Sequence, residues 1–227
     1  MSTAASSESP ALEILPGGVD GPFDFRSLFG NEGPVELEIG VGKGRFLLGQ
    51  AAARPEVNFL GIEWSLKYLR VAKERAQRQG LTNLRLFRAD ARHVLATLLP
   101  DRSVGRVHVY CPDPWPKKRH RKRRLFTPAA VGHIERALIP GGYLHLSTDV
   151  RDYFDEIREM MPASSGLREA EDPLFPIESP GGRTSYEAKY LQAGRPIHRA
   201  TYVRPAEPAG RPQGISRRMS PDSIRTR

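Results

Sequence analysis

Hydrophobic and polar positions along this chain follow two spacings, one typical of β-strands and one typical of α-helices. Five segments have strand spacing or form short apolar runs: residues 35–39, 57–62, 84–87, the segment around Val107 and Val109, and residues 143–146. Segments with helical spacing follow each of the first four. The pattern therefore predicts strands and helices in alternation, and no internal repeat is visible.

Capping residues mark the first two predicted helices. A glycine turn at residues 40–44 leads into an apolar-rich helix over about 45–53. Ser65 is placed to cap a second helix with one apolar face, and Gly80 is placed to end it. Both helices therefore begin directly after a predicted strand.

The next two helices have similar signals. Asp90 is placed to cap a third helix. Thr127 precedes Pro128, which is tolerated where the first amide of a helix has no partner inside the helix. The pair Gly141-Gly142 is predicted to end this fourth helix and to start the fifth strand.

Strands that alternate with helices of this length predict an α/β fold with a mostly parallel twisted sheet and helices on both faces. The 227 residues, 39% of them hydrophobic, allow one core of domain size. We assign this domain to residues 31–203. Residues 1–30 are predicted to be a flexible N-terminal segment, and residues 204–227 a basic tail without fixed structure.

Acidic residues lie at the end of, or just after, all five predicted strands. They are Glu38, Glu63, Asp90, Asp113 and Asp149. Ligands bind beyond the carboxyl ends of parallel strands, so these acids predict a ligand site at that edge of the sheet. Each acid also has a purely structural interpretation. Asp90 and Asp149 are well placed as helix caps, and Glu36 or Glu38 would face solvent on an alternating strand.

The glycine turn predicts a type of cofactor. Gly40 and Gly42 let the backbone bend tightly and approach a ligand. The spacing up to Arg45 departs from the dinucleotide fingerprint, which disfavours a nicotinamide cofactor. Glu63 suits the hydroxyls of a ribose, and Asp90 suits an exocyclic adenine amine. With the acid before the turn, these residues suit a ligand with an ammonium group, a ribose and an adenine, such as S-adenosylmethionine.

Positive charge is concentrated in two segments. Residues 117–124 contain seven Lys or Arg and no acid, and residues 204–227 contain six Arg and two acids. The whole chain has a formal net charge of +9, so the remaining residues sum to about −2. Basic patches on a near-neutral body predict a polyanionic partner. Nucleic acid is favoured over a membrane because no basic amphipathic helix accompanies the run, and a solvated surface run is the alternative.

Other features narrow the class of protein. The single cysteine, Cys111, excludes an internal disulfide framework and is typical of a packed hydrophobe rather than a nucleophile. His120 has no second His or Cys at metal spacing, so we expect no metal. The start of the chain lacks the pattern of a signal peptide, and no stretch approaches the roughly 18 apolar residues of a membrane span. We therefore expect a cytoplasmic protein without membrane contact.

A run of prolines with an acid and a tryptophan follows the fourth predicted strand and leads into the basic segment. This run, residues 112–120, together with the glycine turn, Glu63 and Asp90, resembles the bacterial tRNA (guanine-N7)-methyltransferase family. Residues 184–187 are similar to the T-x-[YF]-E signature near the C-terminus of that family. The resemblance spans about residues 33–203. The glycine turn would fit any class I methyltransferase, whereas the proline-rich run is specific.

The resemblance implies a Rossmann-like class I methyltransferase that transfers a methyl group from S-adenosylmethionine to N7 of guanosine 46 in the variable loop of tRNA. It implies cofactor contacts at Glu38, Gly40, Gly42, Glu63, Asp90 and Asp113. It implies substrate contacts at Lys117, Asp149, Thr184, Ser185, Tyr186 and Glu187. Asp113 is the implied catalytic residue.

The chemistry of this reaction suggests a role for the acid. Guanine N7 presents an in-plane lone pair, so methylation there needs no obligatory general base, and most of the acceleration comes from alignment. Asp113, braced by Pro112 and Pro114, is placed to accept hydrogen bonds from guanine and to counter its developing charge. Trp115 either stacks on the target base or packs under the loop.

The basic segment is expected to bind tRNA. Lys117 is expected to contact the substrate near the reacting base, and residues 118–124 to hold phosphates without selecting sequence. The Arg-rich tail is a further candidate contact.

Two alternatives remain open. An adenine-N6 methyltransferase also has a proline-rich turn after its fourth strand, although in a different residue order. An RNA-binding module that kept the fold without activity would explain the basic segment, but not five acids at strand ends.

Overall fold

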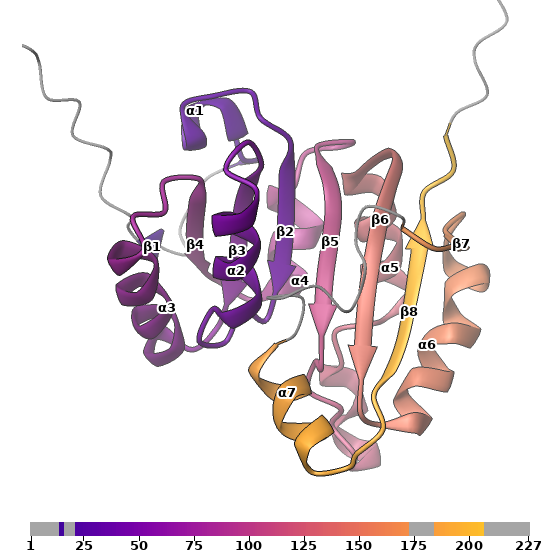
Figure 1. Ribbon diagram of the computed structural model, residues 1–227. Coiled ribbons are helices and arrows are strands. Elements are labelled where there is room, and N and C mark those ends of the chain that lie inside the picture. The colour runs from indigo at the N-terminus through magenta and orange to yellow at the C-terminus, as the bar shows by residue number, and fades with distance from the viewer. Residues whose placement is uncertain (1–13, 16–20, 173–183, 207–227) are drawn as a thin grey trace, which may run out of the picture.

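The computed structural model describes residues 14–15, 21–172 and 184–206, and within them eight strands form one sheet (Figure 1). The elements are β1 (Ile14–Leu15), α1 (Phe25–Phe29), β2 (Val35–Ile39), α2 (Arg45–Ala53), β3 (Asn58–Glu63), α3 (Leu66–Arg78), β4 (Leu84–Arg88), α4 (Ala91–His93), the π-helix η1 (Val94–Leu98), β5 (Val104–Tyr110), the 3-10 helix η2 (Lys118–Arg123), α5 (Pro128–Ala137), β6 (Leu138–Thr148), α6 (Arg151–Ser164), β7 (Arg168–Glu169), α7 (Ser185–Gln192) and β8 (His198–Val203).

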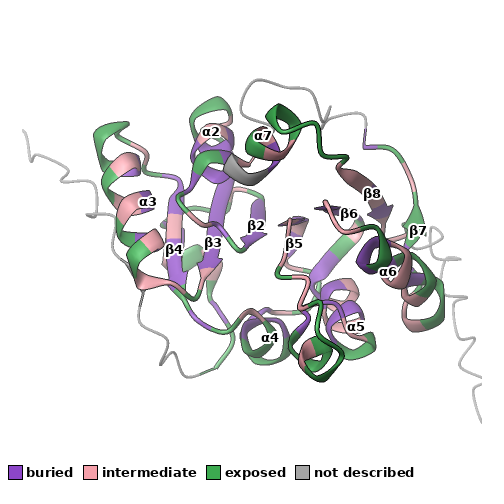
Figure 2. Ribbon diagram, turned by 90° about the horizontal axis from the view of Figure 1, so that it is seen from below, coloured by how far each residue is buried: buried purple, intermediate pink, exposed green. Residues whose placement is uncertain are grey.

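The strand order is β1-β4-β3-β2-β5-β6-β8-β7. Pairing is parallel from β1 to β6 and antiparallel where β8 joins β6 and β7. Helices α2, α3 and α7 lie on one face, and α4, α5 and α6 lie on the other (Figure 2). The predicted α/β fold is therefore confirmed. The elements that were not predicted are β1, α1, η2, α6, β7, α7 and β8.

Two apolar clusters hold the helices on the sheet. The larger cluster joins β2, β5 and β6 to α5 and α6, and the smaller joins β3 and β4 to α2 and α3. Packing in the smaller cluster is close, because a Cβ atom at Gly44 would lie 3.0 Å from the Cβ of Ala72 and 2.6 Å from Leu48. Gly44 also has φ of 82°, so both the backbone and the helix contact require glycine.

The predicted caps are present. The Ser65 hydroxyl accepts a hydrogen bond from the Tyr68 amide, and Thr127 accepts one from the Ala130 amide at 3.2 Å. Asp90 accepts one from the Arg92 amide at 2.9 Å. These caps explain why α3, α4 and α5 begin where the sequence predicts.

The predicted end of α5 is wrong. The helix ends at Ala137, and Gly141-Gly142 lies inside β6, between residues that pair with β5. Arg204 explains the early end, because its guanidinium donates to the carbonyls of Glu135, Arg136 and Leu138 at 2.8, 3.2 and 2.6 Å. A side chain from far along the chain thus satisfies carbonyls that a longer helix would have used.

Described residues on either side of the predicted domain, 21–30 and Arg204, contact it. Phe23 and Phe29 are buried in the core, so residues 21–30 pack against the domain although they were expected to be flexible. Arg204, expected in the tail, also pairs its backbone with Gly141 and Gly142. Residues 1–13, 16–20 and 207–227 lie outside the described residues.

Strand β2 is buried along its whole length. All five of its residues are buried, including Glu36 and Glu38, because helices cover both faces of the sheet. The interpretation that either glutamate faces solvent is wrong. Among the described residues, no helix is long and apolar enough to cross a membrane.

Candidate active site

The carboxyl ends of the parallel strands meet at one edge of the sheet, the edge from which Figure 2 is seen. The five predicted acids lie at or after the ends of these strands: Glu38 near the end of β2, Glu63 as the last residue of β3, and Asp90, Asp113 and Asp149 after β4, β5 and β6. The structure therefore brings the five acids to one edge of the sheet. Their side chains have different environments there.

Glu38 is the most buried of these acids. Its side chain is 1% exposed, and its Oε2 atom has no hydrogen-bond partner among the described residues. Burial raises its pKa well above the ordinary value, and the charges of Glu187 and Glu63 add to this effect against a hydrogen bond from the Leu47 amide. An unsatisfied buried carboxyl group fits a cationic ligand group, such as an ammonium.

The glycine turn leaves space beside this carboxyl group. Gly40 and Gly42 have φ of 83° and 56°, and a Cβ atom at either would meet nothing within 4 Å. The Gly42 amide donates to Glu63 Oε2 at 2.9 Å, and the Ser65 amide donates to Glu63 Oε1 at 2.8 Å. Glu63 is thus oriented by two backbone amides, and its remaining lone pairs suit ribose hydroxyls. These residues fit the predicted cofactor, S-adenosylmethionine.

Asp90 has a partner of its own. Its Oδ2 accepts from the Arg92 guanidinium at 3.0 Å, and this hydrogen bond lowers the pKa of Asp90. Asp90 is therefore a helix cap and an ion-pair partner in this structure. A ligand amine at this position would share the carboxylate with Arg92.

Asp113 is exposed on a loop whose two ends have unusual backbone angles. Cys111 and Trp115 have φ of 48° and 42°, a region that costs non-glycine residues on the order of 1–3 kcal/mol each. The Cys111 amide donates to the Ser147 carbonyl of β6 at 2.8 Å, which anchors the first end. Asp113 is therefore displayed by a constrained loop rather than a free one.

Arg124 anchors the second end. It is 3% exposed, its Nε donates to the Pro114 carbonyl at 2.8 Å, and its guanidinium forms an ion pair with Glu156 and lies 4.4 Å from the centre of the Tyr153 ring. The predicted phosphate contact at Arg124 is wrong, because the side chain is buried in the protein. The sequence pattern does not distinguish Arg124 from the exposed cations, because it is one of seven Lys or Arg within residues 117–124.

The rest of the basic segment remains available to a partner. Lys117 and the cations of η2 are exposed. Trp115 packs against this segment, with the Arg123 guanidinium 5.0 Å from its ring centre and the His120 ring edge-on at 5.9 Å. These contacts favour packing under the loop over stacking on a base.

Helix α7 covers the same edge through a buried glutamate. Thr184 and Glu187 form a capping box, with hydrogen bonds of 3.1 and 2.9 Å between them. Glu187 is 1% exposed, and its Oε1 accepts from Ser147 at 2.9 Å and Arg199 at 3.2 Å. Glu187 therefore positions α7. Sequence reasoning missed both partners, because they come from β6 and β8.

The other predicted substrate contacts lie around this helix. Ser185 and Tyr186 form its first turn. Asp149, whose side chain is 10% exposed, forms an ion pair with Arg195 at 2.8 Å just after α7.

Two further groups limit the chemistry. Burial raises the pKa of the Cys111 thiol to about 12, so it stays protonated near neutral pH, as expected of a packed cysteine. Among the described residues, no group of three His, Cys, Asp or Glu is arranged to hold a metal ion.

Comparisons with known proteins give the family of this chain. A family model described as "Putative methyltransferase" matches residues 32–200. A tRNA (guanine-N(7)-)-methyltransferase of Nitrosococcus oceani is 39% identical over 177 residues, which cover 78% of this chain and 74% of that protein. One of Myxococcus xanthus is 36% identical over 192 residues, 82% of this chain and 90% of that protein.

Solved structures share the fold at low identity. The 16S rRNA methyltransferase KamB has a TM-score of 0.61 at 19% identity, with 85% of this chain and 98% of that chain covered. The aminoglycoside resistance methyltransferase NpmB1 has a TM-score of 0.54 at 20% identity, with 80% and 92% covered. The predicted methyltransferase fold is thereby confirmed. On sequence, site geometry and fold together, the chain belongs to the tRNA (guanine-N(7)-)-methyltransferase family.

Proposed function

We propose that this protein transfers a methyl group from S-adenosylmethionine to N7 of guanosine 46 in the variable loop of tRNA, in the cytoplasm. One observation carries the proposal: the constrained loop that displays Asp113 lies at the same strand edge as the unsatisfied carboxyl of Glu38. The names of the relatives support tRNA and guanine N7. Position 46 rests on the family resemblance.

Three acids would hold the cofactor. Glu38 suits its ammonium group, Glu63 its ribose, and Asp90 its adenine amine. When bound, S-adenosylmethionine supplies a methyl group attached to a positively charged sulfur. The buried negative charge of an ionised Glu38 would be compensated by the ligand, as buried charges require.

Asp113 would act on the guanine. Because N7 carries its own lone pair, no side chain has to remove a proton from the base. The carboxylate of Asp113 would accept hydrogen bonds from the N1–H edge and counter positive charge on the purine. The constrained backbone at Cys111 and Trp115 would keep the carboxylate in one position, which favours catalysis by orientation.

The remaining contacts would hold the tRNA. The candidate substrate contacts are Lys117, residues 184–186 in the first turn of α7, and Asp149. Glu187 would act indirectly by fixing α7 on β6. Exposed cations of residues 118–123 would contact phosphates.

The decisive experiment replaces Asp113 with Ala and with Asn. With unmodified tRNA and labelled cofactor, Asp113→Ala should lower kcat about 1,000-fold, while cofactor affinity stays within a few-fold. Asp113→Asn keeps the size of the side chain and measures the contribution of charge. Near-wild-type turnover of the Ala variant would contradict the role of Asp113.

The product of the wild-type protein is mapped by chain cleavage specific for N7-methylguanine. Label at guanosine 46 supports the proposal, and label at an adenine amine would favour the alternative methyltransferase. Tight tRNA binding without turnover would favour the RNA-binding module.

A further inference from the structure

A third basic region lies within the part of the chain whose formal net charge is close to zero. Residues 43–45 and 66–79 together contain seven Lys or Arg and one acid. Outside residues 117–124 and 204–227, the formal charge of the chain is about −2. Residues 43–45 and 66–79 contribute +6 to it, so the remaining residues carry about −8. Positive charge is therefore concentrated on α2 and α3 against an acidic background, and such segregation is typical of a polyanion-binding surface.

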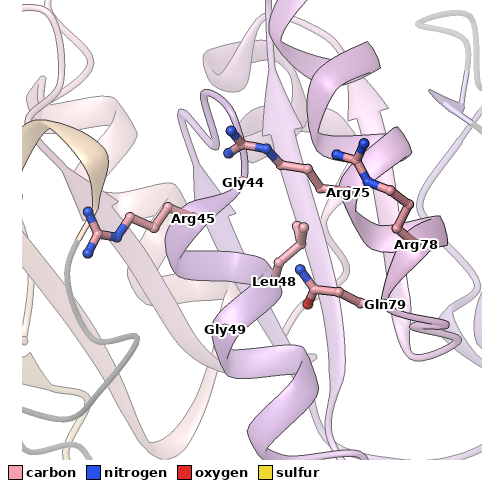
Figure 3. Close-up of a pocket in the computed structure, with 7 residues that line it drawn as sticks. All are labelled: Gly44, Arg45, Leu48, Gly49, Arg75, Arg78 and Gln79. Atoms are coloured by element: carbon pink, nitrogen blue, oxygen red, sulfur yellow. The ribbon is translucent and has the colours of Figure 1, made fainter.

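A cavity of about 390 Å³ lies between these two helices, outside the predicted cofactor site (Figure 3). In Figure 3, Arg75 extends from α3 toward the glycine turn and Arg78 lies beside it, while Leu48 and Gln79 lie between the helices. Arg75 donates to the Lys43 carbonyl at 3.2 Å, which holds its guanidinium at the mouth of the cavity.

The two arginines differ from those arginines of the domain that an acid neutralises. Among the described residues, neither Arg75 nor Arg78 forms an ion pair with an acid. Arg54, one helix away, has a carboxylate partner in Glu36, and Arg124 has one in Glu156. Arg75 uses one donor on the Lys43 carbonyl, and a guanidinium without a carboxylate partner can still offer its remaining donors to the oxygens of a phosphate.

This surface and η2 lie on different sides of the predicted reaction site. Arg92 of α4 contacts the Lys122 carbonyl of η2 at 3.4 Å, and α4 covers the sheet face opposite α2 and α3 (Figure 2). Two helix layers and the sheet between them, each about 10 Å thick, separate the surfaces by roughly 30 Å. Along one strand of a nucleic acid duplex this distance corresponds to about nine phosphates at about 3.4 Å each. A polynucleotide is long enough to contact both.

We propose that Arg75 and Arg78 bind backbone phosphates of the tRNA on the far side of the reaction site from residues 117–123. The inference rests on the proposed function for the identity of the polynucleotide. Contacts of this kind position the substrate without reading its sequence.

The test removes both charges in the variant Arg75→Gln/Arg78→Gln. The variant Arg26→Gln/Arg168→Gln removes two exposed cations elsewhere on the surface and is the matched control. Affinity for tRNA is measured over a series of salt concentrations, with kcat, KM and the affinity for S-adenosylmethionine. We expect the Arg75/Arg78 variant to bind tRNA about tenfold more weakly at low salt and to lose about two units of salt slope.

The other readouts separate binding from structure. The kcat at saturating tRNA and the cofactor affinity should not change, whereas KM for tRNA should rise. The variant Arg75→Lys/Arg78→Lys keeps both charges and should keep the salt slope.

An unchanged slope in the Arg75→Gln/Arg78→Gln variant would overturn the inference, as would an equal loss in the control. A fall in cofactor affinity would overturn it too, because Arg75 would then only support the glycine turn. A wild-type protein that binds tRNA but forms no N7-methylguanine would refute the proposed function alone, and the slopes would still decide this inference.

Discussion

Two glutamates on β2 have the same residue type, the same burial and opposite surroundings. Glu36 and Glu38 are 2% and 1% exposed, and their spacing of two puts them on one face of the sheet. Glu36 accepts hydrogen bonds from Arg54 at 2.6 and 2.7 Å, from Arg106 at 3.0 Å, and it contacts His108 at 3.1 Å. Glu38 has an oxygen without a partner among the described residues.

The surroundings shift the pKa values of Glu36 and Glu38 in opposite directions. Burial acts to raise the pKa of Glu36, but the hydrogen bonds and charges of His108 and Arg54 outweigh it, so the pKa is lowered. Burial raises the pKa of Glu38, and the nearby Glu187 adds to the rise.

The difference separates a structural charge from a functional one. A buried carboxylate with every lone pair satisfied holds neighbouring strands and helices together. A buried carboxyl left unsatisfied costs stability, and such groups are concentrated where a ligand will complete the hydrogen bonds. The position of a glutamate on the strand does not distinguish a structural role from a functional one. Its hydrogen-bond partners do.

The largest effect is expected at Glu36. Glu36→Gln removes the charge that faces Arg54 and Arg106, and a buried ion pair that loses one partner destabilises by about 3–5 kcal/mol. Urea unfolding of the variant should show this loss in the free energy of unfolding. An unchanged urea midpoint would contradict the structural role.

Glu38→Gln is the matched change two residues further along the strand. At pH 4 it should leave the free energy of unfolding within about 1 kcal/mol, because a neutral amide then replaces a carboxyl group that is still protonated. Affinity for S-adenosylmethionine should fall about 10- to 100-fold through loss of a charged hydrogen bond. Calorimetric titration measures it, and unchanged affinity would remove Glu38 from the cofactor site.

Stability should also depend on pH, by about 1.4 kcal/mol for each unit of pKa shift. Burial lowers the pKa of His108 to about 4 from 6.5, so the stability from its neutral form is complete above pH 6.5 and is lost toward pH 4. Glu36 contributes stability above its ordinary value of 4.5 that is lost at lower pH.

The contribution of Glu38 to stability changes with pH in the opposite direction. Its pKa is raised, so its contribution is complete below pH 4.5 and is lost as pH rises through the raised value. Urea midpoints of cofactor-free wild type and Glu38→Gln between pH 4 and 8 test this. The two profiles should diverge toward higher pH, and parallel profiles would contradict the assignment.

The sequence by itself determined the alternation of strands and helices, the caps at Ser65, Asp90 and Thr127, and the acids at strand ends. These features are local, because spacing and capping involve residues within about four positions of one another. The proline-rich run around Asp113 also identified the family, since it is contiguous.

Only the tertiary structure decided which charges are buried and with whom they pair. Glu36 meets His108, which is 72 residues away, and Arg124 meets Glu156, which is 32 residues away. The sequence pattern does not distinguish Glu36 from Glu38, nor Arg124 from its exposed neighbours. Burial and pairing set the free energy of a charge, and both arise from elements brought together by the sheet.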